Sequence, residues 1–255
     1  MPLIAFLIIV QIACAVHCIR HGRSNLWLMV IIFLSLPGCF AYALFEILPH
    51  YAGRREVRAA KSAAIRKLDP ERDVRAARDA LELADTAANR AQLGDALGET
   101  SSWSEAMEHY QAALAKLPGG DRAIRFKLAR ALLEAGDAAQ ARRILETLPE
   151  SGSPSENDRA RLLLARAVEE CGDAEAAIAL YADVGERLPG GEAHCRRAAL
   201  LIASGRSREA LPILEDVHRL AKRLDRFERA QQADMYGWAE RTLTELRAGG
   251  AQDGA

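Results

Sequence analysis

The sequence predicts an all-α protein, in which a two-helix transmembrane hairpin is followed by a solenoid of helix pairs. Three observations support this prediction: an apolar first fifth of the chain, a helix-forming remainder, and a pattern of small and large residues that recurs four times. The chain has 255 residues, enough for one or two domains. Its 34 Lys and Arg residues nearly balance its 35 Asp and Glu residues, which argues against a nucleic-acid-binding protein.

Residues 1–50 form the expected membrane hairpin, with spans at about 2–19 and 26–48. The first span carries no formal charge, and the second carries one, Glu46, near its end. As helices they would be about 27 Å and about 34 Å long, against a hydrocarbon core of about 30 Å. The polar turn at residues 20–25 is so short that both ends of the hairpin lie on one side of the membrane. A cleavable secretory signal is the alternative, although no positively charged segment precedes the first apolar run.

A basic linker at residues 51–70 indicates the orientation of the hairpin. Within it, residues 54–67 carry six basic side chains and one acidic one, whereas the turn of the hairpin carries only Arg20 and Arg23. The positive-inside rule therefore places the linker and everything after it in the cytoplasm. We expect a multi-pass protein of the inner (plasma) membrane, whose linker lies against anionic lipid headgroups. An ordinary stop-transfer flank would have the same composition.

The rest of the chain contains four repeated units, at about residues 87–120, 122–153, 158–190 and 191–224. Each unit has a small residue in its first half, namely Gly94, Ala129, Ala165 and Ala198. Three residues further on, the units have Leu97, Leu132, Val168 and Leu201. Seven residues after the small position, a turn is marked by Ser101, Gly136, Gly172 and Gly205.

The second half of each unit repeats as well. It contains an alanine, at Ala106, Ala141, Ala177 and Ala210, and four residues later a large residue, at Tyr110, Leu145, Tyr181 and Leu214. We expect each unit to form two antiparallel helices that approach closely at the small residues, while the large residues fill the space toward the next pair. One pair cannot bury its apolar face alone, so neighbouring pairs must stack.

Helical segments flank the units, and the whole helical region is expected at residues 71–247. Residues 71–84 form an amphipathic helix, and Asp85 or Thr86 caps the helix that follows it. The segment SGSPSEN at residues 151–157 lengthens the loop before the third unit.

The chain ends in a capping segment and a tail. Residues 226–247 form a last helix or helix pair, whose Tyr236 and Trp238 cover the exposed end of the stack. Residues 248–255, AGGAQDGA, are expected to be disordered.

The four units resemble the tetratricopeptide repeat. The first unit is the nearest to the family pattern, with Leu93, Gly94, Leu97, Ala106, Tyr110, Ala113 and Pro118. Two departures are that no tryptophan opens the first helix and that Arg197 stands where the fourth unit should have a leucine. The resemblance implies an α-solenoid that acts as a scaffold in protein–protein interaction.

The arrangement of two apolar spans before such repeats is similar to that of a family of bacterial membrane tetratricopeptide proteins. The hairpin itself weakly resembles the amino-terminal membrane segment of cardiolipin synthases and related phospholipase D-type enzymes. The matching residues are Trp27, Pro37, Gly38, Tyr42 and Glu46.

The tetratricopeptide resemblance also implies that a protein partner binds in a concave groove lined by the first helix of each pair. By position, the groove residues are Asp95, Glu99, Phe126, Arg130, Glu134, Leu162, Arg166 and Glu170. Arg130 and Arg166 occupy equivalent places in adjacent units and could bind a partner's carboxylates. Each also has a glutamate four residues later, so ion pairs within one helix are the alternative interpretation.

No catalytic motif accompanies the repeats, and we therefore expect a protein that is not an enzyme. None of the six histidines is followed at the second place by lysine, as the phospholipase D motif His-x-Lys-x₄-Asp requires. Glycine-rich phosphate-binding loops are also missing, and no cofactor is expected. Cys171 and Cys195 lie in separate units and are expected to be buried, reduced thiols.

Two alternatives to a membrane-anchored scaffold remain open. Cys14, His17, Cys18 and His21 share one face of the first span and could bind zinc, copper or haem, as in a membrane redox protein. Small apolar cysteines and interfacial histidines in an ordinary span explain the same residues. Cleavage of the first span as a signal would instead make the chain a periplasmic assembly factor.

Overall fold

The computed structural model describes residues 69–224, 229–230 and 232–252, together with eight positions between residues 11 and 37. The chain divides into two units, Met1–Arg72 and Asp73–Ala255, and the second unit contains the repeats. The account below concerns the second unit.

The predicted membrane hairpin falls almost entirely outside the described residues. This applies to both spans, at residues 2–19 and 26–48, to the basic linker before residue 69, and to the cluster of cysteines and histidines in the first span. Among the residues that the structure describes, no helix is long and apolar enough to cross a membrane. The hairpin therefore stays a prediction from the sequence.

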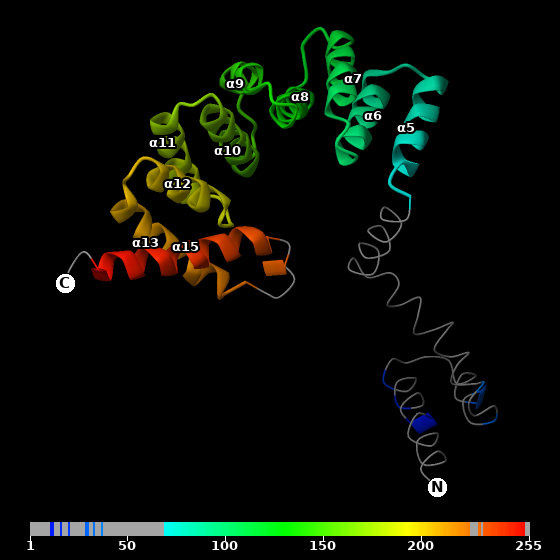
Figure 1. Ribbon diagram of the computed structural model, residues 1–255. Helices are drawn as coiled ribbons and strands as arrows, with labels where there is room; N and C mark the ends of the chain where they lie inside the picture. Colours follow the sequence, from blue (N-terminus) through cyan, green and yellow to red (C-terminus); the bar gives the residue numbers. More distant parts are fainter. Residues whose placement is uncertain are drawn as a thin grey trace. The chain divides into compact units, whose positions relative to one another are not determined.

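The described elements of the second unit are α-helices, and most of them form successive pairs (Figure 1). The first helices of the pairs are α6 (Ala87–Glu99), α8 (Arg122–Glu134), α10 (Pro154–Glu170) and α12 (Glu192–Ala203). The second helices are α7 (Trp103–Ala115), α9 (Ala138–Glu146), α11 (Ala174–Gly185) and α13 (Ser207–Ala221). From α6 to α13 each helix packs against the next one in the chain, and this packing confirms the predicted all-α solenoid of helix pairs.

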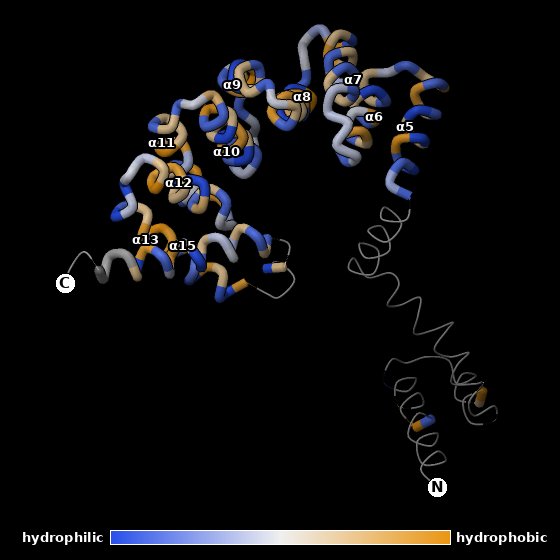
Figure 2. Tube along the Cα trace, viewed as in Figure 1, coloured by the Kyte–Doolittle hydropathy of each residue, from blue (hydrophilic) through white to orange (hydrophobic). Residues whose placement is uncertain are grey.

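The repeated small residues lie where the helices approach one another. Seven of the eight are alanines with 0% exposed surface, and the eighth, Gly94, is also buried. Their large partners Tyr110, Leu145, Tyr181 and Leu214 are at most 6% exposed. A Cβ atom on Gly94 would lie 2.7 Å from the ring of Tyr110, so the first pair needs a glycine where the others have alanine. Figure 2 shows how apolar residues alternate with polar ones along these helices.

The four turns within the pairs share one hydrogen-bonding pattern. The turn residues Ser101, Gly136, Gly172 and Gly205 all have a positive φ, between 61° and 90°. In each pair the N–H of the following residue donates to a carbonyl in the last turn of the first helix, on Leu97, Leu132, Val168 and Leu201. This left-handed helix ending explains why three of the four repeats have glycine at the turn.

Replacing Ser101 by glycine is expected to raise the free energy of unfolding by about 0.5–1 kcal/mol. Ser101 has a φ of 61°, and it is the one residue other than glycine with a positive φ in the described part of the chain. The free energy gained when glycine removes the strain of this left-handed conformation is larger than the free energy lost to the added backbone entropy of the unfolded chain. Chemical unfolding of both proteins measures the change. The matched control is Ser102→Gly, where φ is −81°, and a gain of the same size there would contradict the explanation.

Short polar side chains start several of the helices. The hydroxyl of Thr86 accepts a hydrogen bond from the N–H of Asn89 at 3.1 Å, so Thr86 caps α6. Asp85, the other predicted cap, instead forms an ion pair with Arg90 at 2.6 Å. Asp121 caps α8 in the same way as Thr86 caps α6, and these caps fix where α6 and α8 begin.

The third pair begins earlier than the sequence indicates. The segment at 151–157 was expected to form a longer loop, but α10 begins at Pro154 and has 17 residues. Proline is favoured in the first turn of a helix because its missing N–H would have no partner there. The side chain of Asn157 then holds the preceding loop, since it accepts from the N–H of Ser151 at 2.7 Å and donates to its carbonyl at 2.9 Å.

The last helix, α15 (Ala233–Gln252), packs against α13. Tyr236 is 4% exposed and Trp238 is partly buried in the same apolar cluster, as expected of residues that cover the end of the stack. The helix continues to Gln252, five residues into the segment that the sequence predicts as a disordered tail. A helix that is already nucleated propagates at little cost, which the local composition of the tail does not reveal.

Ion pairs connect each helix pair to the next. They join α6 to α8, α8 to α10, α10 to α12 and α13 to α15, through Asp95–Lys127, Glu134–Arg166, Glu169–Arg196 and Glu215–Arg247. The distances range from 2.6 to 3.2 Å, and the side chains are partly exposed. Such pairs contribute roughly 0–1 kcal/mol each, so they guide the alignment of the pairs more than they stabilise the fold.

The two described cysteines differ in environment. Cys195 is 4% exposed, and burial raises the pKa of its thiol to about 12. Cys171 ends α10 and is exposed, so the expectation that both thiols are buried is wrong for Cys171. Cys171 follows the last residue of α10 and lies next to the turn, outside the packed interface between the helices.

A thiol reagent is therefore expected to modify Cys171 at least about 100-fold faster than Cys195 in the folded protein at pH 8. Only the thiolate reacts, and burial disfavours the thiolate of Cys195. Mass spectrometry of the proteolytic peptides, sampled over time, distinguishes the two sites. In guanidinium the two rates should converge, and similar rates in the native protein would contradict the burial of Cys195.

Candidate functional site

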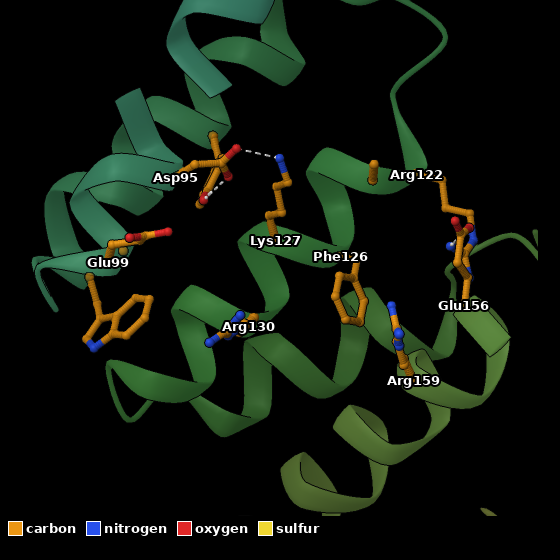
Figure 3. A pocket seen from close by; sticks show the side chains of 12 residues that line it. Asp95, Glu99, Arg122, Phe126, Lys127, Arg130, Glu156 and Arg159 are labelled. Carbon is orange, nitrogen blue, oxygen red and sulfur yellow. Dashed lines mark hydrogen bonds and ion pairs between the residues drawn. The ribbon is translucent and has the colours of Figure 1, made fainter. Parts of the chain in front are cut away.

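A cavity of about 560 Å³ opens among the first helices of three successive pairs (Figure 3). We name it the α8 cavity, because α8 contributes more of its lining than any other helix. The lining residues from α6 and α7 are Asp95, Gly98, Glu99, Trp103 and Tyr110. Those from α8 and α10 are Arg122, Ala123, Phe126, Lys127, Arg130, Glu156 and Arg159.

One end of the α8 cavity is held by a hydrogen-bonded group around Asp95. The hydroxyl of Tyr110 donates to one carboxylate oxygen of Asp95 at 2.8 Å, and the ammonium of Lys127 donates to the other at 2.7 Å. Burial, together with the bond to Asp95, raises the pKa of Tyr110 far above its usual value. Tyr110 therefore stays a neutral donor, and Asp95 is satisfied by partners from α7 and α8.

The other end is built around Arg122 at the start of α8. Its guanidinium donates to the carbonyl of Pro149 at 2.7 Å and to the side chain of Asn157 at 2.9 Å. It also lies 3.5 Å from the carboxylate of Glu156. Arg122 thus joins the second pair to the beginning of α10 and has little capacity left for a ligand.

In the view of Figure 3, Phe126, Arg130 and Arg159 lie between these two groups. Phe126 is partly buried, while Arg130 and Arg159 are exposed. In the described part of the chain, neither arginine has a carboxylate oxygen within 4.0 Å. This part of the cavity therefore combines an aromatic ring with two guanidinium groups that can donate hydrogen bonds to a carboxylate of a ligand.

The α8 cavity brings together half of the residues that the sequence predicts for the groove. Asp95, Glu99, Phe126 and Arg130 line it, whereas Glu134, Leu162, Arg166 and Glu170 do not. The second group has other environments. Glu134 and Arg166 form an ion pair at 3.0 Å, Leu162 packs in the apolar cluster of the third pair, and Glu170 is exposed.

The ion pairs expected within single helices are not the ones observed. No pair of Arg130 with Glu134, or of Arg166 with Glu170, occurs within 4.0 Å in the described residues. Arg166 of α10 reaches Glu134 of the preceding pair instead. Stacking places α8 close enough to α10 for this pairing, and sequence spacing along one helix cannot reveal it.

Several residues of the cavity are not indicated by the repeat pattern of the sequence. Arg122 could have been found, because it lies four residues before Phe126 and therefore on the same face of α8. Trp103 belongs to a second helix, and Arg159 lies in the helix that begins earlier than expected. Their place in the cavity depends on how successive pairs stack, so no local signal marks them.

No group of three or more possible metal ligands occurs among the described residues. The predicted alternative site for a metal or haem, at Cys14, His17, Cys18 and His21, lies outside the described residues.

A tetratricopeptide repeat family model matches residues 100–157, which include α7, α8 and α9. A comparison with curated proteins found no match. Neither the resemblance of the whole arrangement to a membrane tetratricopeptide family nor that of the hairpin to cardiolipin synthases finds support in these comparisons.

Solved structures of the same fold include MamA, residues 41 to the end, from Desulfovibrio magneticus RS-1. Its TM-score is 0.56 at 17% identity, over 66% of this chain and 94% of that one. A double mutant of RS-1 MamA has a TM-score of 0.54 at 17% identity, over 69% and 94% of the two chains.

YrrB, described as a tetratricopeptide protein with an unusual peptide-binding site, has a TM-score of 0.50 at 19% identity. The match covers 64% of this chain and 82% of YrrB. At these identities the likeness concerns the fold. Together with the family match and the four repeated helix pairs, it identifies the described region as a tetratricopeptide-like repeat array.

Proposed function

We propose that this chain is a membrane-anchored scaffold, without enzymatic activity, that binds a segment of a partner protein in the α8 cavity. The observation that carries the proposal is the cavity itself, which opens across three successive helix pairs and has Phe126, Arg130 and Arg159 together in its lining. An open, mixed aromatic and charged surface suits an extended chain segment. YrrB, which shares the fold, is described as having a peptide-binding site, and this supports a similar use of the array here.

Affinity purification of the full chain from native membranes tests the proposal. The variant Arg130→Glu/Arg159→Glu reverses both charges in the middle of the cavity and should lose a partner that the unchanged protein retains. The matched control is Arg143→Glu, since Arg143 is exposed on α9 and does not line the cavity. Arg166 is left unchanged because its ion pair with Glu134 connects two helix pairs.

Three outcomes are distinguishable. Loss of a partner in the double variant but not in Arg143→Glu supports binding in the α8 cavity. Retention of every partner in both variants contradicts it, and loss in both variants would mean that general surface charge, rather than the cavity, determines binding.

The membrane part of the proposal rests on the sequence: two apolar spans and the basic linker that follows them. We propose a hairpin in the inner membrane with the repeats in the cytoplasm and the linker against anionic lipids. Alkaline carbonate should leave the full chain in the membrane fraction, and a variant without residues 1–50 should become extractable. Extraction of the full chain would contradict the anchor.

The exposed thiol of Cys171 reports the orientation of the repeats. In intact spheroplasts a membrane-impermeant maleimide should leave Cys171 unmodified, and permeabilisation should make it reactive. Modification without permeabilisation would place the repeats outside the cytoplasm, as the periplasmic alternative requires. Mass spectrometry of the Cys171 peptide provides the measurement.

A further inference from the structure

The charges of the α8 cavity are unevenly balanced. Four basic and three acidic side chains line it: Arg122, Lys127, Arg130, Arg159, Asp95, Glu99 and Glu156. Two ion pairs within the cavity, Lys127–Asp95 and Arg122–Glu156, use two members of each charge. Beyond these two pairs the lining has two arginines against one glutamate, so the part of the cavity available to a ligand carries a net positive charge.

The two arginines outside these ion pairs share the lining of the cavity with Phe126. Arg130 follows Phe126 by four residues on α8, so both side chains emerge on the same face of that helix. Arg159 approaches from α10, and Figure 3 shows Phe126 with Arg130 on one side and Arg159 on the other in that view. Trp103 and Tyr110 from α7 add two further aromatic rings to the lining.

This arrangement matches a particular kind of peptide. A guanidinium group binds carboxylates through paired N–H donors, and an aromatic ring binds a large apolar side chain. We propose that the α8 cavity selects a partner segment in which a large apolar residue has Asp or Glu within two positions on both sides. This inference rests on the proposed function and specifies the chemistry of the partner.

The same charges disfavour one basic candidate within the chain, the linker at residues 51–70. It carries a strong excess of Arg and Lys and would place those charges against Arg130 and Arg159. Like charges brought together at a binding surface oppose association. The net charge of the α8 cavity therefore favours an acidic segment over this basic linker.

A selection from a displayed library of random peptides tests the inference, because it does not require the partner to be identified first. The full chain in detergent micelles is the target, and each random segment is flanked at both ends by a Gly/Ser spacer. The enriched peptides should contain Leu, Ile, Met, Phe, Tyr or Trp with Asp or Glu within two positions on both sides. The Phe126→Ala variant, used as a second target, should not enrich them.

The binding of one enriched peptide, synthesised with a fluorescent label and a C-terminal amide, then measures the role of each arginine. Arg130→Glu and Arg159→Glu should each weaken binding by about ten-fold or more, while Arg143→Glu should change it by less than about two-fold. A peptide with its acidic residues changed to lysine should bind Arg130→Glu/Arg159→Glu better than it binds the unchanged protein. Thermal unfolding of each variant, with Arg130→Gln as the milder substitution, shows that the variants are folded.

The outcomes separate this inference from the proposed function. Enriched peptides that depend on Phe126 but lack acidic residues overturn the inference and leave binding in the α8 cavity standing. Failure to enrich any peptide contradicts both. If a free C-terminal carboxylate is required in place of the acidic side chains, amidation of the peptide abolishes binding, and the selection of an internal acidic segment is overturned.

Discussion

Replacing Tyr181 by alanine is expected to lower the free energy of unfolding by about 3–5 kcal/mol. Tyr181 is 1% exposed and is the largest of the fully buried side chains. Its ring fills the space of the third pair among Ala165, Val168 and Val184. Truncation would leave a cavity of nearly the whole ring, because the neighbouring residues are held in helices and can close it only in part.

The conservative variant Tyr181→Phe separates the ring from the hydroxyl. The hydroxyl donates to Glu169, which keeps a second partner, Arg196, at 3.2 Å when the hydroxyl is removed. Its loss should therefore cost only about 1 kcal/mol. Guanidinium unfolding followed by circular dichroism measures both variants. Equal losses for the two would mean that the hydroxyl, and not the volume of the ring, determines the stability of this pair.

Replacing Ala129 by leucine is expected to lower the free energy of unfolding by about 2–3 kcal/mol. Ala129 has 0% exposed surface in α8, where α8 meets its neighbours at one of the repeated small positions. Three additional carbon atoms cannot be placed there unless the helices separate or adopt strained side-chain conformations. Chemical unfolding of the full chain gives the measurement.

The exposed residue Ala139 provides the control for this substitution, since it lies in the neighbouring helix α9. Alanine and leucine both favour helices, so the change in helix propensity is small at either position. Ala139→Leu should therefore alter stability by no more than about 0.5 kcal/mol. Comparable losses at the two positions would show that close helix packing is not the reason for the small residue.

The framework of the fold could be predicted from the sequence because it depends on a repeated local pattern. Ala129, Ala165 and Ala198 recur at nearly equal spacing, and the structure buries each of them completely. Glycine at the turns is equally informative, since a positive φ excludes most other residues. The buried alanines and the turn glycines depend only on contacts within one helix pair, so a short stretch of sequence is enough to predict them.

The site was only partly predictable, because it depends on how successive pairs stack. Phe126 and Arg130 both line the α8 cavity, as their shared position on one helix face indicates. The partner of Arg166 could not be predicted in this way, since Glu134 of the preceding pair lies closer than Glu170 of the same helix. Spacing along the chain describes one helix at a time, whereas the rotation between pairs decides which side chains meet.

The early start of α10 shows a further limit of sequence reasoning. Pro154 within SGSPSEN reads as part of a loop, yet proline is also well suited to the first turn of a helix. The two interpretations differ by one helical turn, and that turn contains Glu156, a residue of the α8 cavity. A small error in a boundary therefore removes a residue of the cavity from the prediction.

Two adjacent residues of α8 have opposite environments, so they are subject to different constraints during evolution. Ala129 is fully buried between helices, while its neighbour Arg130 is exposed in the α8 cavity. On the proposed function, substitutions at the exposed residues Arg130 or Arg159 change what is recognised while every buried position stays the same. Natural selection can thus alter the partner of the array one outward residue at a time, without passing through ancestors that fail to fold.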